Sequence, residues 1–244
     1  MTLIDNPAGG FRFLPGGAAF SEGTVAMPGF EIVRATLQRP LPYREGFALI
    51  DQHLAGLGRP IAALAAVELR APAPFTMAGF GIFNAGYQEQ ILARDLLVGG
   101  LNPVARTNVA PAIRPPAEPA LYAFSYAVPG DSVGPSFVSA GAGELVGGAI
   151  IREGDTSPDG MREKARVVMG MITERMAGMG AALDDVTAVS VYSVFSPFDF
   201  LADTVLSPLG PAAIHAFQWY YSRPPVLGLE FEMDLRGVRQ EIRL

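Results

Sequence analysis

The sequence predicts an α+β protein built from two similar halves, in each of which helices cover one face of a mixed β-sheet. Three observations support this class. Short motifs recur at offsets near half the chain length, both halves alternate β-rich and helical segments in one order, and 50% of the 244 residues are hydrophobic. That apolar content is enough for a sizeable core, and the length fits one large domain or two small ones.

Short motifs repeat in the same order along both halves. Residues 20–23 (Phe-Ser-Glu-Gly) recur as residues 138–141 (Val-Ser-Ala-Gly), an offset of 118. Five further pairs follow at similar offsets: residues 31–34 with 149–152, 44–45 with 162–163, 55–58 with 177–180, 74–75 with 197–198, and 114–116 with 223–225. Single matches of this length arise by chance, whereas six in one order do not. We therefore predict two tandem domains, residues 1–128 and 129–244.

The second half shows the order β-β-β-α-β-α-β-β most clearly. Runs rich in β-branched and aromatic residues predict strands at residues 121–128, 136–140 and 148–152. Apolar residues at helical spacing predict a helix over residues 161–179, which ends at Gly180. A strand at 186–195, a helix at 197–206 and strands at 217–222 and 228–235 complete the half.

The first half repeats this order, with helices near residues 43–57 and 76–97 and a strand at 61–69 between them. Two helices cover only one face of each sheet, so the other face needs a partner. We expect that partner to come from other copies of the chain, in a homo-oligomer and most readily a trimer.

Composition excludes several kinds of chemistry. There is no cysteine, which rules out disulfides, thiolate metal sites and cysteine nucleophiles, and two histidines (His53 and His215) are too few for a multi-histidine metal centre. We therefore predict no metal and no cofactor. The single lysine, Lys164, lies among charged residues of a predicted helix, and we expect it on a solvated face. A net charge of −6 without a basic stripe argues against a nucleic-acid partner.

No membrane segment is expected. The longest apolar stretches are too short to span a bilayer, and the N-terminal segment lacks the basic and apolar regions of a secretory signal. We expect a cytoplasmic protein without a membrane partner.

Three motifs resemble the RidA (YjgF) superfamily. Residues 124–128 (Phe-Ser-Tyr-Ala-Val) followed by 137–141 resemble the opening motif of the family. Residues 105–109 (Ala-Arg-Thr-Asn-Val) resemble the strand that carries its substrate-binding arginine, and residues 229–232 (Leu-Glu-Phe-Glu) resemble the strand that carries its catalytic glutamate. The resemblance spans the chain as two tandem copies. It implies trimerising β-β-β-α-β-α-β-β units that hydrolyse enamines and imines to ketones and ammonia without a cofactor.

The resemblance also implies roles for particular residues. It makes Glu230 the catalytic acid–base residue and Arg106 the carboxylate-binding group, because the planar fork of arginine can grip a carboxylate with two hydrogen bonds. The other candidates are Ser139 as a catalytic hydrogen-bonding partner, and Thr107, Asn108, Ser21, Arg223 and Arg114 as substrate-binding residues.

The two site motifs have decayed in a complementary way. The arginine motif is intact only in the first half and the glutamate motif only in the second, so we expect a composite site that pairs Arg106 with Glu230. One alternative is that the acid–base group is Glu118, Glu22 or an ordered water. Another concerns Glu230 itself, because Glu230, Glu232 and Asp234 share one strand face, a pattern typical of solvent-facing positions.

The sequence therefore predicts a deaminase acting on a small carboxylate-bearing enamine or imine, similar to the 2-aminomuconate deaminases among tandem relatives of RidA. A ligand-binding or scaffolding oligomer without turnover is the alternative. An endoribonuclease, an activity ascribed to some relatives, is disfavoured by the acidic charge.

Overall fold

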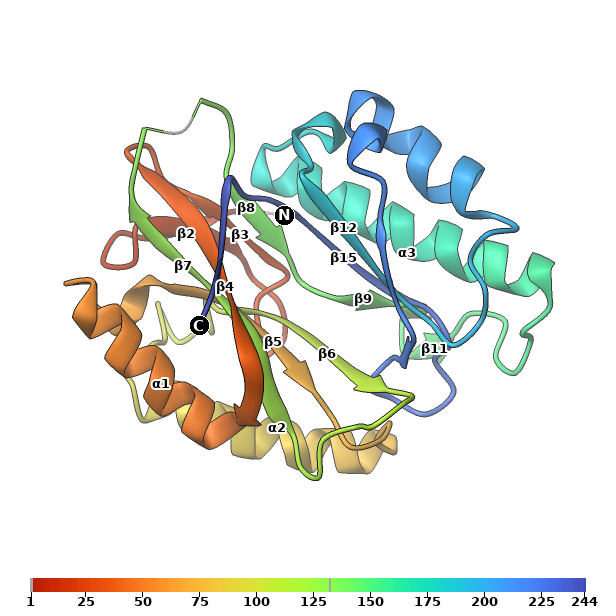
Figure 1. Cartoon of the computed structure of the whole chain (residues 1–244), viewed down its shortest axis with the longest axis horizontal. Coiled ribbons are helices and arrows are strands. Elements are labelled where there is room, and N and C mark those ends of the chain that lie inside the picture. Colours follow the sequence, from red (N-terminus) through yellow and green to blue (C-terminus); the bar gives the residue numbers. More distant parts are fainter. Residues whose placement is uncertain (1, 132) are drawn as a thin grey trace.

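Two mixed β-sheets form the centre of the molecule (Figure 1), a computed structural model that describes residues 2–131 and 133–244. The first sheet has the strand order β14-β6-β5-β7-β4-β16. Its strands are β4 (Phe30–Pro42), β5 (Leu64–Arg70), β6 (Ala105–Pro111), β7 (Ala120–Pro129), β14 (Ser222–Arg223) and β16 (Gln240–Arg243). The mixed α+β class is confirmed.

The second sheet has the order β1-β2-β3-β8-β15-β12-β13, and β9 also pairs with β15. Its strands are β1 (Ile4–Asn6), β2 (Phe11–Leu14), β3 (Gly23–Ala26), β8 (Phe137–Ser139), β9 (Ala142–Gly143), β12 (Ala188–Tyr192), β13 (Gln218–Tyr220) and β15 (Glu232–Gly237). A separate hairpin pairs β10 (Leu145–Val146) with β11 (Ala149–Ile150).

Helices cover one face of each sheet. In Figure 1, α1 (Tyr43–Gly56) and α2 (Met77–Leu92) lie beside the first sheet, whereas α3 (Pro158–Met179) lies on the far side of the second. Each helical layer has its own apolar cluster. Phe47, Ile50 and Leu54 of α1 and Phe83 and Tyr87 of α2 are buried on the first sheet.

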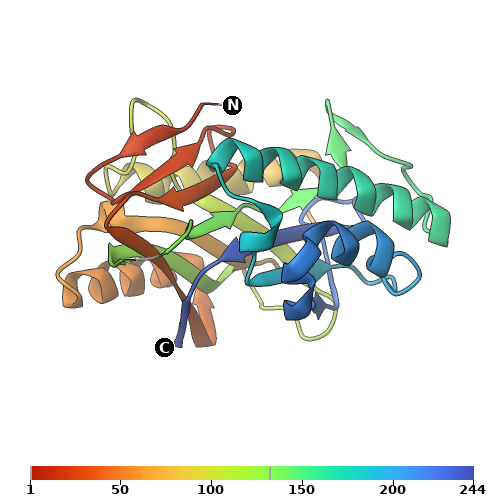
Figure 2. The ribbon, with the colours of Figure 1, turned by 90° about the horizontal axis from the view of Figure 1, so that it is seen from above.

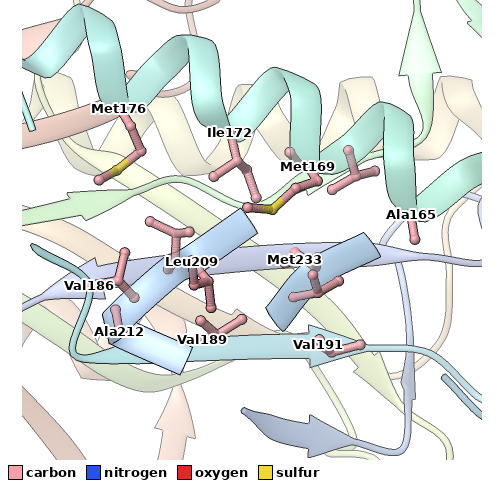
Figure 3. Close-up of a cluster of buried hydrophobic side chains, with 14 of the residues drawn as sticks. Ala165, Met169, Ile172, Met176, Val186, Val189, Val191, Leu209, Ala212 and Met233 are labelled. Carbon is pink, nitrogen blue, oxygen red and sulfur yellow. The ribbon is translucent and has the colours of Figure 1, made fainter. Parts of the chain in front are cut away.

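Helix α3 ends at Met179, as its sequence predicts, but begins at Pro158 rather than at residue 161. The Ser157 hydroxyl accepts a hydrogen bond from the Gly160 N–H at 3.2 Å, and Gly180 ends the helix with a φ of 71°, a conformation that glycine adopts without strain. Ala165, Met169, Ile172 and Met176 point from α3 toward the second sheet (Figure 3). Opposite them lie Val186, Val189, Val191, Met233, Leu209 and Ala212.

Both sheets take strands from both halves of the sequence. Strand β3 pairs antiparallel with β8, with Gly23 opposite Ser139, so the two repeated serine segments lie side by side. In return, β16 pairs parallel with β4, with Gln240 opposite Val33, and Figure 2 shows the blue C-terminal segment running back to this strand. The domain boundary between residues 128 and 129 stays a prediction, since each half of the sequence adds strands to the sheet of the other half.

The sheet faces that the helices leave free pack against each other through buried polar groups and two small apolar clusters. Arg34 and Glu68 of the first sheet form an ion pair at 2.6 Å. Burial alone would raise the pKa of the Glu68 carboxyl, but the positive charges of Arg34, Arg236 and Arg70 outweigh this effect and lower the pKa to about 2. Thr107 donates a hydrogen bond across the sheets to Asp234 at 2.9 Å. The free faces thus meet within one chain through buried polar groups, and the expected homo-oligomer stays a prediction.

Two expected elements are formed differently. The strand expected at residues 148–152 is reduced to the short β11 of the hairpin, because Gly147 and Gly148 both have positive φ and make a tight turn. The helix expected at residues 197–206 begins only at Ala202, as η3 (Ala202–Leu206), and continues as η4 (Ser207–His215). Pro211 and a φ of 55° at Gly210 interrupt its regular hydrogen bonding.

We predict that neither half folds by itself. A fragment of residues 1–128 leaves β1–β3 without the β8 edge, and a fragment of residues 129–244 leaves β14 and β16 without β6 and β4. Separately expressed fragments should show no cooperative thermal transition by circular dichroism, and co-expression should recover a folded complex. A sigmoidal melt from either fragment alone would contradict this.

None of the helices within the described residues is long and apolar enough to cross a membrane.

Candidate functional site

A cavity of about 180 Å³ lies where strand β6 of the first sheet meets β9, the start of β15 and α3. Four of its lining side chains are polar: Arg106, Asn108, Arg175 and Glu232. The rest of the wall is largely apolar and includes Phe20, Phe80, Leu145, Met171, Val226 and Leu229. Both halves of the sequence contribute, which is the arrangement expected of a composite site.

Arg106 is held in an aromatic slot at one side of the cavity. It is 3% exposed, and its guanidinium lies 4.6 Å from the ring centroids of both Phe20 and Tyr87. Its Nη2 donates to Asn84 Oδ1 at 2.6 Å, while its Nη1 has no hydrogen-bond partner among the described residues. Burial lowers the pKa of Arg106 to about 10, so it is a cation at neutral pH with a free donor.

Glu232 supplies the carboxyl group of the cavity. It is the first residue of β15 and is 3% exposed. Burial, followed by the nearby Asp234 and Glu144, raises the pKa of Glu232 well above its usual value, although Arg106 and Arg70 act in the opposite direction. Gly141, at the end of the repeated serine motif, makes room for this group, because a Cβ at position 141 would collide with Glu232 Oε1.

Asn108 and Arg175 complete the polar part of the wall. Both amide atoms of Asn108 are buried and lack a hydrogen-bond partner among the described residues, which is costly unless something else binds there. Arg175 projects from α3 and is 7% exposed. The cavity therefore combines two guanidinium groups, an unpaired amide and a carboxyl whose pKa is raised by burial.

Several predicted site residues lie elsewhere. Thr107 points to the opposite face of β6 and bonds to Asp234 in the polar layer between the sheets. The hydroxyl of Ser21 donates to the carbonyl of Pro103 at 2.9 Å, and that of Ser139 to the carbonyl of Ala140 at 3.3 Å. These hydroxyls are fully buried and bonded to backbone, and neither serine is part of the cavity wall.

Glu230, Arg223 and Arg114 also lie away from the cavity wall. Glu230 and Arg223 form an ion pair with each other at 2.9 Å, and Arg114 is exposed in a loop with a φ of 50°. Of the predicted substrate-binding residues, the structure brings Arg106 and Asn108 together in the cavity. The catalytic roles of Glu230 and Ser139 stay predictions.

Glu232, rather than the predicted Glu230, lines the cavity for a local structural reason. The N–H groups of Glu230 and Phe231 donate to the Glu144 carboxylate at 2.6 and 3.1 Å, so β15 begins only at Glu232. The expectation that the acids of this strand face solvent is wrong for Glu232 and Asp234, which are 3% and 4% exposed. The motif Leu-Glu-Phe-Glu contains both glutamates and could have indicated either one.

The expectation that Lys164 is solvated is also wrong. Its side chain is 0% exposed, and its Nζ lies 3.1 Å from Glu144 Oε1 and donates to the carbonyl of Ile151 at 2.8 Å. Glu144, likewise 0% exposed, thus connects α3 to the start of β15. The ion pair fixes the backbone immediately before Glu232.

Arg175 in the cavity wall and Asn84, which bonds to Arg106, were not predicted from the sequence. Arg175 lies in the long helix without any motif around it, and Asn84 reaches Arg106 from α2, which is 22 residues earlier in the chain. Helical periodicity could have placed Arg175 near the buried Ile172 and Met176, but nothing in the sequence connects it to β6.

This fold and cavity define a class of α+β protein in which a buried guanidinium and a buried carboxyl from opposite halves of the chain line one site. Residues 3–242 match the family model described as 2-aminomuconate deaminase CnbZ, and the chain belongs to that family.

Known relatives agree in sequence and in fold. The chain is 40% identical over 241 residues to a 2-amino-5-chloromuconate deaminase of Comamonas testosteroni, an alignment that covers 96% of this chain and 95% of the relative. The crystal structure of a chorismatase matches with a TM-score of 0.53 and 15% identity over 92% of this chain and 80% of that one, which shows a shared fold.

Proposed function

We propose that this protein is a hydrolytic deaminase that converts 2-aminomuconate, or a substituted form of it, to the corresponding oxo acid and ammonia. The single observation that carries the proposal is that Arg106 and Glu232, from opposite halves of the chain, line one buried cavity. The substrate class follows from the family and from the relative that acts on 2-amino-5-chloromuconate.

Arg106 would hold one carboxylate of the substrate. Its Nη1 is the unpaired donor, and Asn84 together with the rings of Phe20 and Tyr87 fixes the plane of the guanidinium. A fixed, desolvated cation orients the substrate with little loss of entropy, which is a large part of the catalytic effect that positioning supplies.

Glu232 would move the protons. The enamine first takes a proton on carbon and becomes an imine, then the oxygen of a water bonds to the imine carbon, and finally the carbon–nitrogen bond breaks as ammonia leaves. The nitrogen must gain protons and the water must lose them. A carboxyl whose pKa is raised by burial can give and recover a proton near neutral pH.

We further propose that the chain is a tandem two-domain member of the RidA superfamily that acts as a homotrimer in the cytoplasm. The repeated serine segments on the paired strands β3 and β8 and the Ala-Arg-Thr-Asn-Val strand support the superfamily assignment.

The decisive experiment compares two glutamates two residues apart. Ammonia release from enzymatically generated 2-aminomuconate should fall by roughly 10²- to 10⁴-fold in Glu232→Gln, and by far less in Glu230→Gln, whose side chain pairs with Arg223 outside the cavity. The wild-type rate should also fall as pH rises through the raised pKa of Glu232, because the protonated form is then lost.

Three results would contradict the proposal. A wild-type protein that binds 2-aminomuconate without releasing ammonia would indicate a ligand-binding protein. A large loss in Glu230→Gln with activity kept in Glu232→Gln would move the acid–base role back to Glu230. An alkaline limb that persists unchanged in a residually active Glu232→Gln would assign the titration to another group.

A further inference from the structure

The cavity contains a second buried guanidinium, that of Arg175, which the proposed chemistry does not use. Its Nη1 donates to the carbonyl of Ala140 at 3.0 Å, and its Nε lies 3.6 Å from Glu22 Oε2. The Glu22 side chain is 28% exposed and makes only this long ion pair within the described residues. The Nη1 of Arg175 also lies 3.5 Å from the carbonyl oxygen of Gly141. Arg175 is thus held through Nη1 and Nε, and its carboxylate partner is partly in solvent.

The charges in the cavity do not balance. Arg106 and Arg175 both contribute a positive charge, and no ion pair within 4.0 Å joins either guanidinium to Glu232 among the described residues. The Glu22 carboxylate partly neutralises Arg175 from outside the cavity wall, at a distance longer than a normal hydrogen bond. Buried cations without counter-ions are unfavourable, so this cavity is electrostatically complementary to a ligand with two negative charges.

The wall between the charged groups suits a carbon chain. Met171 lies one helical turn before Arg175 on α3, and Val226 and Leu229 come from the segment before β15. These apolar side chains offer contacts to an unsaturated chain that joins two carboxylates.

We propose that Arg175 binds the second carboxylate of a dicarboxylate whose first carboxylate is bound by Arg106, so that Arg175 selects diacids over monoacids. This inference rests on the proposed function for the identity of the site. Glu22 then acts as a competitor, whose carboxylate occupies Arg175 in the free protein and yields it to the substrate.

The test uses two unreactive ligands that differ in one carboxylate. Muconate has a six-carbon diene chain with a carboxylate at each end, and sorbate has the same chain with a methyl group at one end. Calorimetric titration should show muconate binding to the wild type roughly 10- to 100-fold more tightly than sorbate, the range typical of a charge-assisted contact.

Arg175→Met should abolish this preference by weakening muconate to about the affinity of sorbate, with sorbate itself changed by less than about threefold. Arg166→Met, on the exposed side of the same helix, is the matched control and should keep the wild-type ratio. An unchanged ratio in Arg175→Met, or an equal loss for both ligands, would overturn the proposal, since an arginine that only braces Ala140 would affect both alike.

If Arg175→Met does not fold, the variant Glu22→Gln tests whether Arg175 binds the second carboxylate. Removing the competing carboxylate should raise the affinity for muconate by about threefold or more and leave sorbate unchanged. No change in the ratio, or a fall, would overturn the proposal by this route.

These ligands do not react, so the result is independent of turnover. If the wild type releases ammonia but the ratio of its affinities for muconate and sorbate does not depend on Arg175, this inference is rejected and the proposed function is retained. If this affinity ratio depends on Arg175 but no ammonia is released, the inference about Arg175 is retained and the proposed function is rejected.

Discussion

Arg106→Ala is expected to lower kcat/KM for 2-aminomuconate by about 100-fold or more, because a buried charge-assisted contact to a carboxylate is lost. Arg106→Lys should also be poor. An ammonium group cannot reproduce the planar fork, and at this position it would lose the contact with Asn84 and the stacking on Phe20 and Tyr87. The measurement is ammonia release at substrate concentrations well below KM.

Folding must be shown to survive these changes. Arg106 forms no ion pair within 4.0 Å among the described residues, so its removal breaks no direct ion pair, and circular dichroism and thermal melting should stay close to the wild type. Arg44→Ala, which breaks an exposed pair with Glu89, is the control for loss of an arginine. Activity of Arg106→Ala within about threefold of the parent would remove Arg106 from the site.

Lys164→Met is expected to lower the free energy of unfolding by about 3–5 kcal/mol. The substitution keeps the volume of the side chain but leaves the Glu144 carboxylate fully buried without its cation. That carboxylate also accepts the N–H groups of Glu230 and Phe231, so its disturbance should reach β15. Urea unfolding followed by circular dichroism measures the loss.

A double-mutant cycle isolates the pair. Glu144→Gln with Lys164→Met should be clearly less destabilised than the sum of the two single variants, because the neutral amide no longer needs a counter-ion. Arg44→Met should change stability little, since both members of its pair are exposed. An unfolding free energy of Lys164→Met within about 0.5 kcal/mol of the wild type would contradict the assignment of a buried ion pair.

The difference between Arg106 and Lys164 shows what the sequence can predict. Arg106 lies in a short motif that resembles the arginine strand of the RidA superfamily, and this resemblance indicated its role as a substrate-binding residue. Lys164 stands between Glu163 and Ala165 on a helix with charged neighbours, a pattern typical of a solvated face. Its partner Glu144 lies 20 residues earlier in an irregular segment, and only the tertiary fold brings the two together.

Local signals predicted the helices better than the strand pairing. The termini of α3 depend on Ser157 and Gly180, which are visible in the sequence. The pairing of β3 with β8 and of β16 with β4 depends on how the two sheets meet. The hydrophobic patterns of these four strands do not indicate which strand pairs with which. The place of Glu232 rather than Glu230 in the cavity wall could not be predicted for the same reason, because Glu144 sets where β15 begins.

The exchange of strands between the sheets also restricts how the molecule can move. A hinge that opened the two halves like a clamshell would have to break the β3–β8 and β4–β16 ladders, so the two halves behave as one rigid frame. A ligand therefore reaches the cavity without a hinge motion of the two halves. The hairpin of β10 and β11, which contributes Leu145 to the wall and belongs to neither large sheet, is the element least tied to that frame.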